Sequence, residues 1–184
     1  MTEKTLPFPR GSTASDAGLV SLDDSTFSEL EGKIFEVPDT VHGTGQPILL
    51  RAVKNDSGAA ITVARKFMRF ALAALDFGRR VAGFVNAAGA VCKPLDDAYT
   101  VGFSIPDDDI FYVVEAGKCN VLTEASAVAL DAGSVVASDA SGFVNGAPCA
   151  QASEYAAGKI GPAAYATATA VVVEVQAGLR QIGT

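Results

Sequence analysis

Short runs of apolar and β-branched residues, separated by glycine-, proline- and aspartate-rich turns, predict a chain built from strands. Such spacing is typical of an all-β sandwich or barrel. We therefore expect a compact all-β domain. The expected strands are residues 33–37, 47–53, 60–70, 84–86, 101–103, 110–115, 119–123, 133–136, 143–144, 160–161 and 171–175.

Two turns determine how the first of these strands should be connected. Residues 55–58 read Asn-Asp-Ser-Gly, a strong turn sequence, so residues 47–53 and 60–70 are predicted to form a hairpin. Gly117 is predicted to turn the chain between residues 110–115 and 119–123. Residues 71–75 remain ambiguous between strand and helix, because Ala and Leu favour helix.

A tetrapeptide, Gly-Phe-Val-Asn, occurs twice, at residues 83–86 and 142–145, an offset of 142 − 83 = 59. Across residues 83–115 and 142–174, ten of 33 positions are identical without a gap. We interpret this as an internal repeat of one β unit, in which the two copies are equivalent strands on one core. The alternative is two unrelated hairpins that share a turn sequence.

The N-terminal residues lack this strand pattern. Prolines, glycine and serines interrupt residues 1–24, and the apolar side chains are scattered. We expect residues 1–32 to form an extended arm with a short helical turn at 25–31, and residues 33–184 to form the β domain. The arm should order only against a partner, so deleting residues 2–24 should leave the melting temperature nearly unchanged; the alternative is a solvated tail with no role. Its candidate contact residues are Leu6, Phe8, Leu19, Val20 and Leu22.

The net charge of −7 is unevenly distributed. Residues 1–40 carry 3 basic and 8 acidic side chains, residues 41–80 carry 7 and 2, and residues 81–184 carry 4 and 11, giving −5, +5 and −7. The acidic balance argues against nucleic acid as a partner. The basic stretch either contacts an acidic neighbour or is a solvated face. Its candidate contact residues are Arg65, Lys66 and Arg69.

Candidate catalytic and metal-binding chemistry is sparse. His42 is the single histidine and no Gly-x-Ser-x-Gly sequence is present, so a serine hydrolase is disfavoured and we expect no enzyme activity. The cysteines Cys92, Cys119 and Cys149 have long spacings that favour buried free thiols over a zinc site. Asp107, Asp108 and Asp109 are expected to form a solvated turn; a divalent cation site is the alternative. We expect no cofactor.

No segment is apolar for long enough to predict a membrane span or a secretory signal, so no membrane partner is expected. The odd number of cysteines and the missing signal sequence together predict that all three thiols are unpaired, as in a reducing compartment.

Residues 41–58 resemble the opening of the head decoration (cement) proteins of tailed bacteriophages, in which a similar His-Gly-Thr-Gly segment leads to a strand and an Asn-Asp turn. The resemblance covers roughly residues 35–184 and rests on turn sequences rather than chemical signatures. The further matching segments are residues 78–83, 109–115, 119–123, 132–136, 160–161 and 171–175.

This resemblance implies a non-enzymatic β protein that is made in the bacterial cytoplasm and binds the outer surface of an icosahedral capsid. It further implies a homotrimer at three-fold and quasi-three-fold positions, with the major capsid protein as partner. Two other classes stay open. One is a different virion surface or host-attachment module that binds sugar or protein, although Trp is absent and the tyrosines are dispersed. The other is a small hydrolase.

Overall fold

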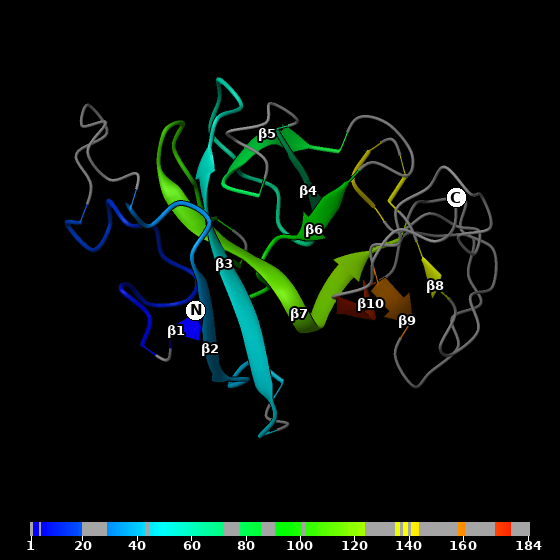
Figure 1. Ribbon diagram of the computed structural model, residues 1–184. Coiled ribbons are helices and arrows are strands. Elements are labelled where there is room, and N and C mark those ends of the chain that lie inside the picture. Colours follow the sequence, from blue (N-terminus) through cyan, green and yellow to red (C-terminus); the bar gives the residue numbers. More distant parts are fainter. Residues whose placement is uncertain are drawn as a thin grey trace.

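The chain folds as an all-β protein in the computed structural model, which confirms the expected fold class (Figure 1). The strands are β1 Thr2–Glu3, β2 Ile34–Pro38, β3 Pro47–Asn55, β4 Phe67–Phe70, β5 Arg80–Phe84, β6 Cys92–Pro94, β7 Ile110–Leu122, β8 Val135–Val136, β9 Gly158–Ile160 and β10 Val172–Ala177. The structure describes residues 2–3, 5–19, 29–42, 45–71, 78–85, 91–100, 102–123, 135–136, 138–139, 141–143, 158–160 and 172–177. Within these ranges, no helix has the length and apolar content needed to cross a bilayer.

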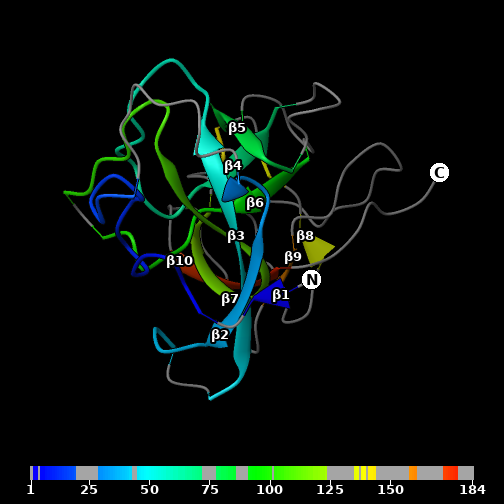
Figure 2. The same cartoon turned by 60° about the vertical axis from the view of Figure 1, so that its left-hand side comes forward.

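Five strands curl into a half-barrel sheet, which we call the barrel (Figure 2). Their hydrogen-bonded order is β6-β4-β5-β3-β7, and a bridge from Leu95, directly after β6, to Val113 in β7 brings the sheet back on itself. β2 pairs with β3 along residues 47–51, and β1 pairs with β2. The far half of β7 leaves the barrel and pairs with β10, which continues through β9 to β8.

The length of β7 differs from the prediction, because the chain does not turn at Gly117. Leu49 pairs with Ala116 and Leu50 with Val114, so Glu115 is the extra residue of a β-bulge. Gly117 has a φ of +123°, and a Cβ there would lie 2.9 Å from the side chain of Ile48. The bulge and the glycine bend the strand without ending it, so β7 serves both the barrel and the second sheet.

The predicted hairpin between residues 47–53 and 60–70 is wrong. β3 ends in the expected turn, but β4 pairs with β5 and β6 instead. The buried side chain of Asn55 donates to the carbonyl oxygens of Ala59, Ile105 and Pro106, at 2.9, 3.2 and 2.9 Å. These bonds join the turn to a distant loop, and only Ile61 forms a β-bridge, to Ile105, before β4 begins.

Two apolar clusters lie on opposite sides of β7. Successive residues of the strand alternate between them: Tyr112 and Val114 belong to one cluster, and Phe111 and Val113 to the other. Both sides of β7 are therefore buried in the barrel, which explains why this strand reads as a continuous apolar run.

The N-terminal segment is part of the first cluster, and the expectation of an arm without contacts in its own domain is wrong for residues 5–19. Phe8 is 2% exposed and its ring stacks on Tyr112 with centroids 4.3 Å apart. Ala14 is fully buried, and Leu6 and Leu19 pack against the same cluster. Val20, Leu22 and residues 25–28 of the expected helical turn lie outside the described residues, and residues 29–32 form a turn.

The two tetrapeptide copies differ in secondary structure where both are described. Gly83 and Phe84 end β5, whereas Gly142 and Phe143 lie in a bend. The Asp139 carboxylate makes this bend by accepting the backbone N–H groups of Ser141 and Phe143 at 2.8 and 2.7 Å. The prediction of a strand at Phe143 is therefore wrong. The prediction that residues 83–115 and 142–174 superpose stays a prediction. Asn86, Val144 and Asn145 lie outside the described residues.

Of the remaining expected strands, one is wrong and three are confirmed. Residues 101–103 are not a strand in their described part, because Gly102 adopts a φ of +92° in a turn. Near the C-terminus, β8, β9 and β10 overlap residues 133–136, 160–161 and 171–175, which confirms strands there with shifted bounds.

Candidate functional site: the Arg10–His42 cluster

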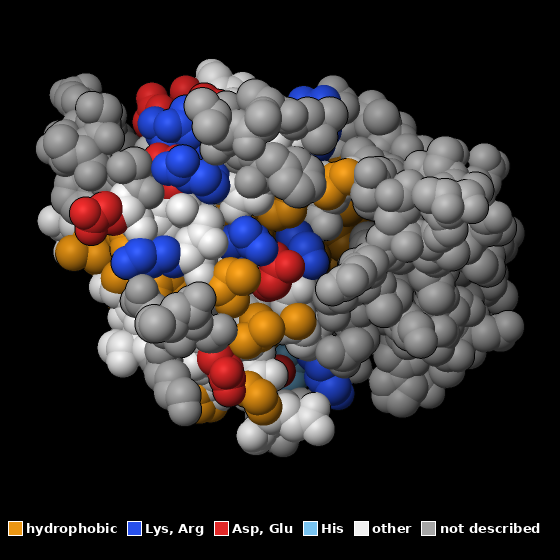
Figure 3. Space-filling view, in the orientation of Figure 1, with side chains coloured by type: hydrophobic (Ala, Val, Ile, Leu, Met, Phe, Trp, Pro, Cys, Tyr) orange, Lys and Arg blue, Asp and Glu red, His pale blue; other side chains and the backbone are white. Residues whose placement is uncertain are grey.

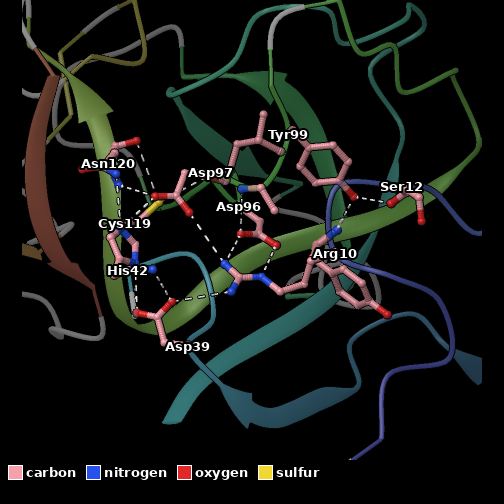
Figure 4. Close-up of polar contacts among 12 residues, drawn as sticks. Arg10, Ser12, Asp39, His42, Asp96, Asp97, Tyr99, Cys119 and Asn120 are labelled. Carbon is pink, nitrogen blue, oxygen red and sulfur yellow. Dashed lines mark hydrogen bonds and ion pairs between the residues drawn. The ribbon is translucent and has the colours of Figure 1, made fainter. Parts of the chain in front are cut away.

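Six polar residues meet at one end of the barrel (Figure 4). Arg10 comes from the N-terminal segment, Asp39 and His42 from the loop after β2, Asp96 and Asp97 from the turn after β6, and Asn120 from β7. We call these six residues the Arg10–His42 cluster. Their side chains join four parts of the chain that are far apart in sequence.

Arg10 is held chiefly by Asp96. Nε of Arg10 donates to Oδ2 of Asp96 at 3.0 Å, and Nη2 donates to Oδ1 at 2.6 Å, which is the two-pronged geometry that guanidinium and carboxylate groups favour. The carboxylates of Asp39 and Asp97 each lie 3.6 Å from the guanidinium. Burial acts to lower the pKa of Arg10, but the hydrogen bond and charge of Asp96 prevail and raise it.

His42 lies between two carboxylates. Its Nδ1 is 2.9 Å from Oδ2 of Asp39, and its Nε2 is 3.0 Å from Oδ2 of Asp97 and 3.2 Å from Nδ2 of Asn120. Only one-tenth of the His42 side chain is exposed.

The two carboxylates beside His42 respond in opposite directions. Burial acts to raise the pKa of Asp39, but hydrogen bonds from the backbone and ring of His42, with the charges of His42 and Arg10, lower it. Burial raises the pKa of Asp97, because the N–H of Asn120 and the charges of His42 and Arg10 offset that effect only in part. Keeping Asp97 ionised in the folded protein therefore costs more free energy than keeping Asp39 ionised.

Two buried tyrosines also hold the N-terminal segment against the barrel. The hydroxyl of Tyr99 donates to the carbonyl of Ser12 at 2.6 Å and accepts the N–H of Tyr112 at 3.3 Å. The hydroxyl of Tyr112 donates to the carbonyl of Phe8 at 3.2 Å. Aromatic stacking, hydrogen bonds and the Arg10–Asp96 pair thus fasten the same stretch of chain to the barrel.

An Asp–His pair can serve as a general base, so the neighbouring nucleophiles decide whether this cluster resembles a hydrolase site. Cys119 is fully buried, its Sγ lies 3.3 Å from the carbonyl oxygen of Leu95, and burial raises its pKa well above the ordinary value. A protonated buried thiol is a poor nucleophile. Cys119 is therefore not set up to act as a nucleophile beside this Asp–His pair.

The thiols and carboxylates singled out in the sequence are separated in space. Cys92 and Cys119 are free and buried, as expected, and burial raises the pKa of Cys92 to about 12; Cys149 lies outside the described residues. Asp107 accepts the N–H of Gly58, Asp108 pairs with Lys54, and the buried Asp109 binds Ser15. Among the described residues, no three His, Cys, Asp or Glu side chains are grouped to hold a metal ion.

The residues predicted to contact a partner are not gathered on one surface. Phe8 is buried in its own domain, and Leu6 and Leu19 are partly covered by the same cluster. Arg69 donates to the carbonyl of Ala82 at 3.3 Å, and Lys66 donates to the carbonyl of Ser141 at 3.1 Å. Arg65 alone of the described candidates is largely exposed, at a backbone φ of +60°.

The described surface carries few large apolar side chains. Val41 and Val63, each 43% exposed, are the large hydrophobic residues that stand out to solvent in the described ranges. Basic side chains lie beside acidic ones, as in the pairs of Arg51 and Lys93 with Glu115 and of Arg80 with Glu31, and Figure 3 shows this mixture on one face.

Comparison with known proteins adds no family assignment. No family model, no curated protein and no solved structure matches this chain.

Proposed function

We propose that this chain is a structural virion protein that binds the outer surface of an icosahedral phage head and stabilises it, as a trimer at three-fold and quasi-three-fold positions. The observation that carries the proposal is the resemblance of residues 41–58. Here that segment runs from the His42 loop through β3 into the Asn55 turn, the order that the resemblance implies.

The roles of these residues support a structural protein. His42 joins two carboxylates, and Asn55 joins its own turn to Ile105 and Pro106. Both residues connect distant parts of the chain and belong to the framework of the domain. A rigid framework favours a clamp, because little conformational entropy is then lost when it binds.

The surface that meets the capsid is proposed to include residues 62–65 rather than the N-terminal segment. Val63 and Arg65 are exposed there, and the segment lines a groove of about 390 Å³ together with Tyr99 and Phe103. An exposed apolar residue beside an arginine matches the composition of interface centres. Paired substitutions Val63→Asp and Arg65→Glu should weaken binding to empty capsids while leaving the melting temperature of the free protein unchanged.

Quantitative mass spectrometry of purified virions tests the proposal. A copy number on the order of hundreds per particle is expected for a protein that decorates repeated positions of an icosahedral shell. A handful of copies would instead support the host-attachment alternative. Because a protein that binds only the assembled shell stabilises it by mass action, particles lacking this chain should also burst at lower temperature. Equal thermal stability with and without the chain would overturn the stabilising role.

A further inference from the structure

The groove beside residues 62–65 is enclosed by three separate parts of the chain. Val63 lines it from one segment, Tyr99 and Phe103 line it from a second, and Leu122 lines it from the end of β7. Its volume of about 390 Å³ lies near the lower end of the range for ligand sites, roughly 300–1,000 Å³. The groove can therefore take up apolar side chains of a short segment, but not the face of a folded domain.

The backbone of residues 62–64 is unpaired within the part of the chain that the structure describes. The chain passes through these residues without a turn or a bend. On one side, Ile61 exchanges two backbone hydrogen bonds with Ile105, both at 2.9 Å, and on the other the carbonyl oxygen of Arg65 accepts the N–H of Leu122 at 2.9 Å. None of the described residues forms a backbone hydrogen bond with the three residues in between. An unbent, unpaired stretch between two fixed ends is a short edge to which another strand can add.

The charge of the groove favours an acidic ligand. Arg65 is exposed, and no carboxylate in the described part of the chain pairs with its guanidinium. Asp97 also lines the groove, but its side chain is only 2% exposed, and its carboxylate lies 3.0 Å from His42 and 3.6 Å from Arg10. The charge of Asp97 is thus directed into the domain, whereas the charge of Arg65 faces solvent.

We propose that residues 62–64 and this groove bind an extended acidic segment of the capsid subunit, which adds to the chain as a short β-strand. The inference rests on the proposed function, which supplies the capsid subunit as the partner. Backbone hydrogen bonds to residues 62–64 hold the segment, one of its apolar side chains enters the groove beside Val63, and an acidic side chain pairs with Arg65. Since Val63 and Arg65 are two positions apart, the apolar and acidic residues of the bound segment should also be two positions apart.

Hydrogen–deuterium exchange tests the strand addition, when it is measured by mass spectrometry on the free protein and on the protein bound to empty capsids. The amides of residues 62–64 should exchange at least tenfold more slowly in the bound protein, because they then donate to the added strand. The exposed turn at residues 40–41 is the control and should keep its rate. Unchanged exchange at residues 62–64 in capsid-bound protein would overturn the strand addition and leave the proposed function standing. A protein that does not sediment with capsids would overturn the proposed function itself.

Photo-cross-linking identifies the occupant of the groove. A diazirine-bearing residue is placed at Thr100, which is exposed and lines the groove, and the capsid-bound protein is irradiated. We expect a covalent bond to a capsid segment that carries an apolar and an acidic residue two positions apart. A bond to a second copy of this chain, or to a capsid segment without an acidic residue, would contradict the proposal.

Substitutions separate the charge of the groove from its apolar surface. Arg65→Glu should weaken binding to empty capsids about tenfold, and Arg65→Lys should weaken it less because it keeps the charge. Val63→Asp should also weaken binding, whereas Val41→Asp, at a valine that is equally exposed (43%) but does not line the groove, is the matched control and should not. The melting temperature of each free variant should equal that of the wild type. Capsid binding by Arg65→Glu that is as tight as that of the wild type would rule out the acidic occupant.

Discussion

Phe84 and Phe143 share one cation: Nζ of Lys66 lies 5.0 Å from the ring centre of Phe84 and 4.2 Å from that of Phe143. These phenylalanines occupy the same position in the two Gly-Phe-Val-Asn copies. The backbone joins the copies as well, because Phe67 donates its N–H to Gly142 and accepts the N–H of Val85, at 2.7 and 3.2 Å. The repeated motif therefore marks two segments that meet around β4.

Replacing Lys66 tests the strength of this junction. Lys66→Met keeps the length of the side chain but removes the ammonium that two rings and the Ser141 carbonyl share. We expect a loss of roughly 1 kcal/mol in the free energy of unfolding, measured with urea, because partly desolvated cation–π pairs contribute that much. Lys66→Arg, which keeps a cation over aromatic faces, should lose less than half as much. Equal stability of Lys66→Met and the wild type would show that the shared cation contributes nothing.

Phe8 should behave as a core residue. Truncation by Phe8→Ala removes a ring that is 2% exposed and stacked on Tyr112, so we expect a loss of about 3 kcal/mol in urea unfolding. Leu6→Ala, at a partly buried position in the same segment, is the matched control and should cost clearly less. Deleting residues 2–24 should accordingly lower the melting temperature, contrary to the behaviour of a loose arm. An unchanged melting temperature for both Phe8→Ala and the deletion would contradict this packing.

Asn55 and Phe8 show which features of the fold could be predicted from the sequence and which could not. Asn55 lies in a local turn sequence, so the turn was predictable, but its bonds to Ile105 and Pro106 depend on tertiary contacts that no local pattern encodes. Phe8 sits among prolines without periodicity, and the residue that buries it, Tyr112, is 104 positions away. Strands with alternating or continuous apolar runs were therefore predictable, whereas their pairing and the place of the N-terminal segment were not.

The Arg10–His42 cluster escaped prediction for a related reason. Its carboxylates, Asp39, Asp96 and Asp97, look like ordinary turn residues, and Arg10 looks like a solvated charge. The available signal was His42, a single histidine three residues after an aspartate. Its second carboxylate comes from the turn after β6, which only the folded barrel brings within 3.0 Å.

Substitutions at Asn55 test whether its hydrogen bonds stabilise the turn that follows β3. Asn55→Ala leaves the carbonyls of Ala59, Ile105 and Pro106 without this donor, and one of these bonds is fully buried. We expect a loss of about 2 to 3 kcal/mol in the free energy of unfolding. Asn55→Asp is nearly the same shape but its carboxylate cannot donate, so it should be at least as damaging, whereas Ser57→Ala should cost less than 1 kcal/mol. A well-tolerated Asn55→Asp would mean that shape rather than donation matters here.

Acid should weaken the fold through carboxylates whose pKa is lowered in the native state. Burial acts to raise the pKa of Glu115, but the hydrogen bond and charge of Arg51 and the charge of Lys93 lower it below its ordinary value of 4.5; the pKa of Asp39 likewise lies below 3.8. A carboxyl group with a lower pKa in the folded than in the unfolded state stabilises the fold above its unfolded pKa. That contribution is lost as the pH falls through the folded pKa.

We therefore expect the urea midpoint to decline between about pH 5 and pH 3. Asp97, whose pKa is raised by burial, contributes with the opposite sign, since its protonated form is favoured in the fold. Glu115→Gln should flatten the decline, because the bulge of β7 then carries no group to titrate against Arg51 and Lys93. Asp56→Asn, at an exposed turn position, is the control and should leave the slope unchanged. If Glu115→Gln keeps the wild-type slope while lowering stability at every pH, the carboxylate stabilises β7 by packing and not by charge.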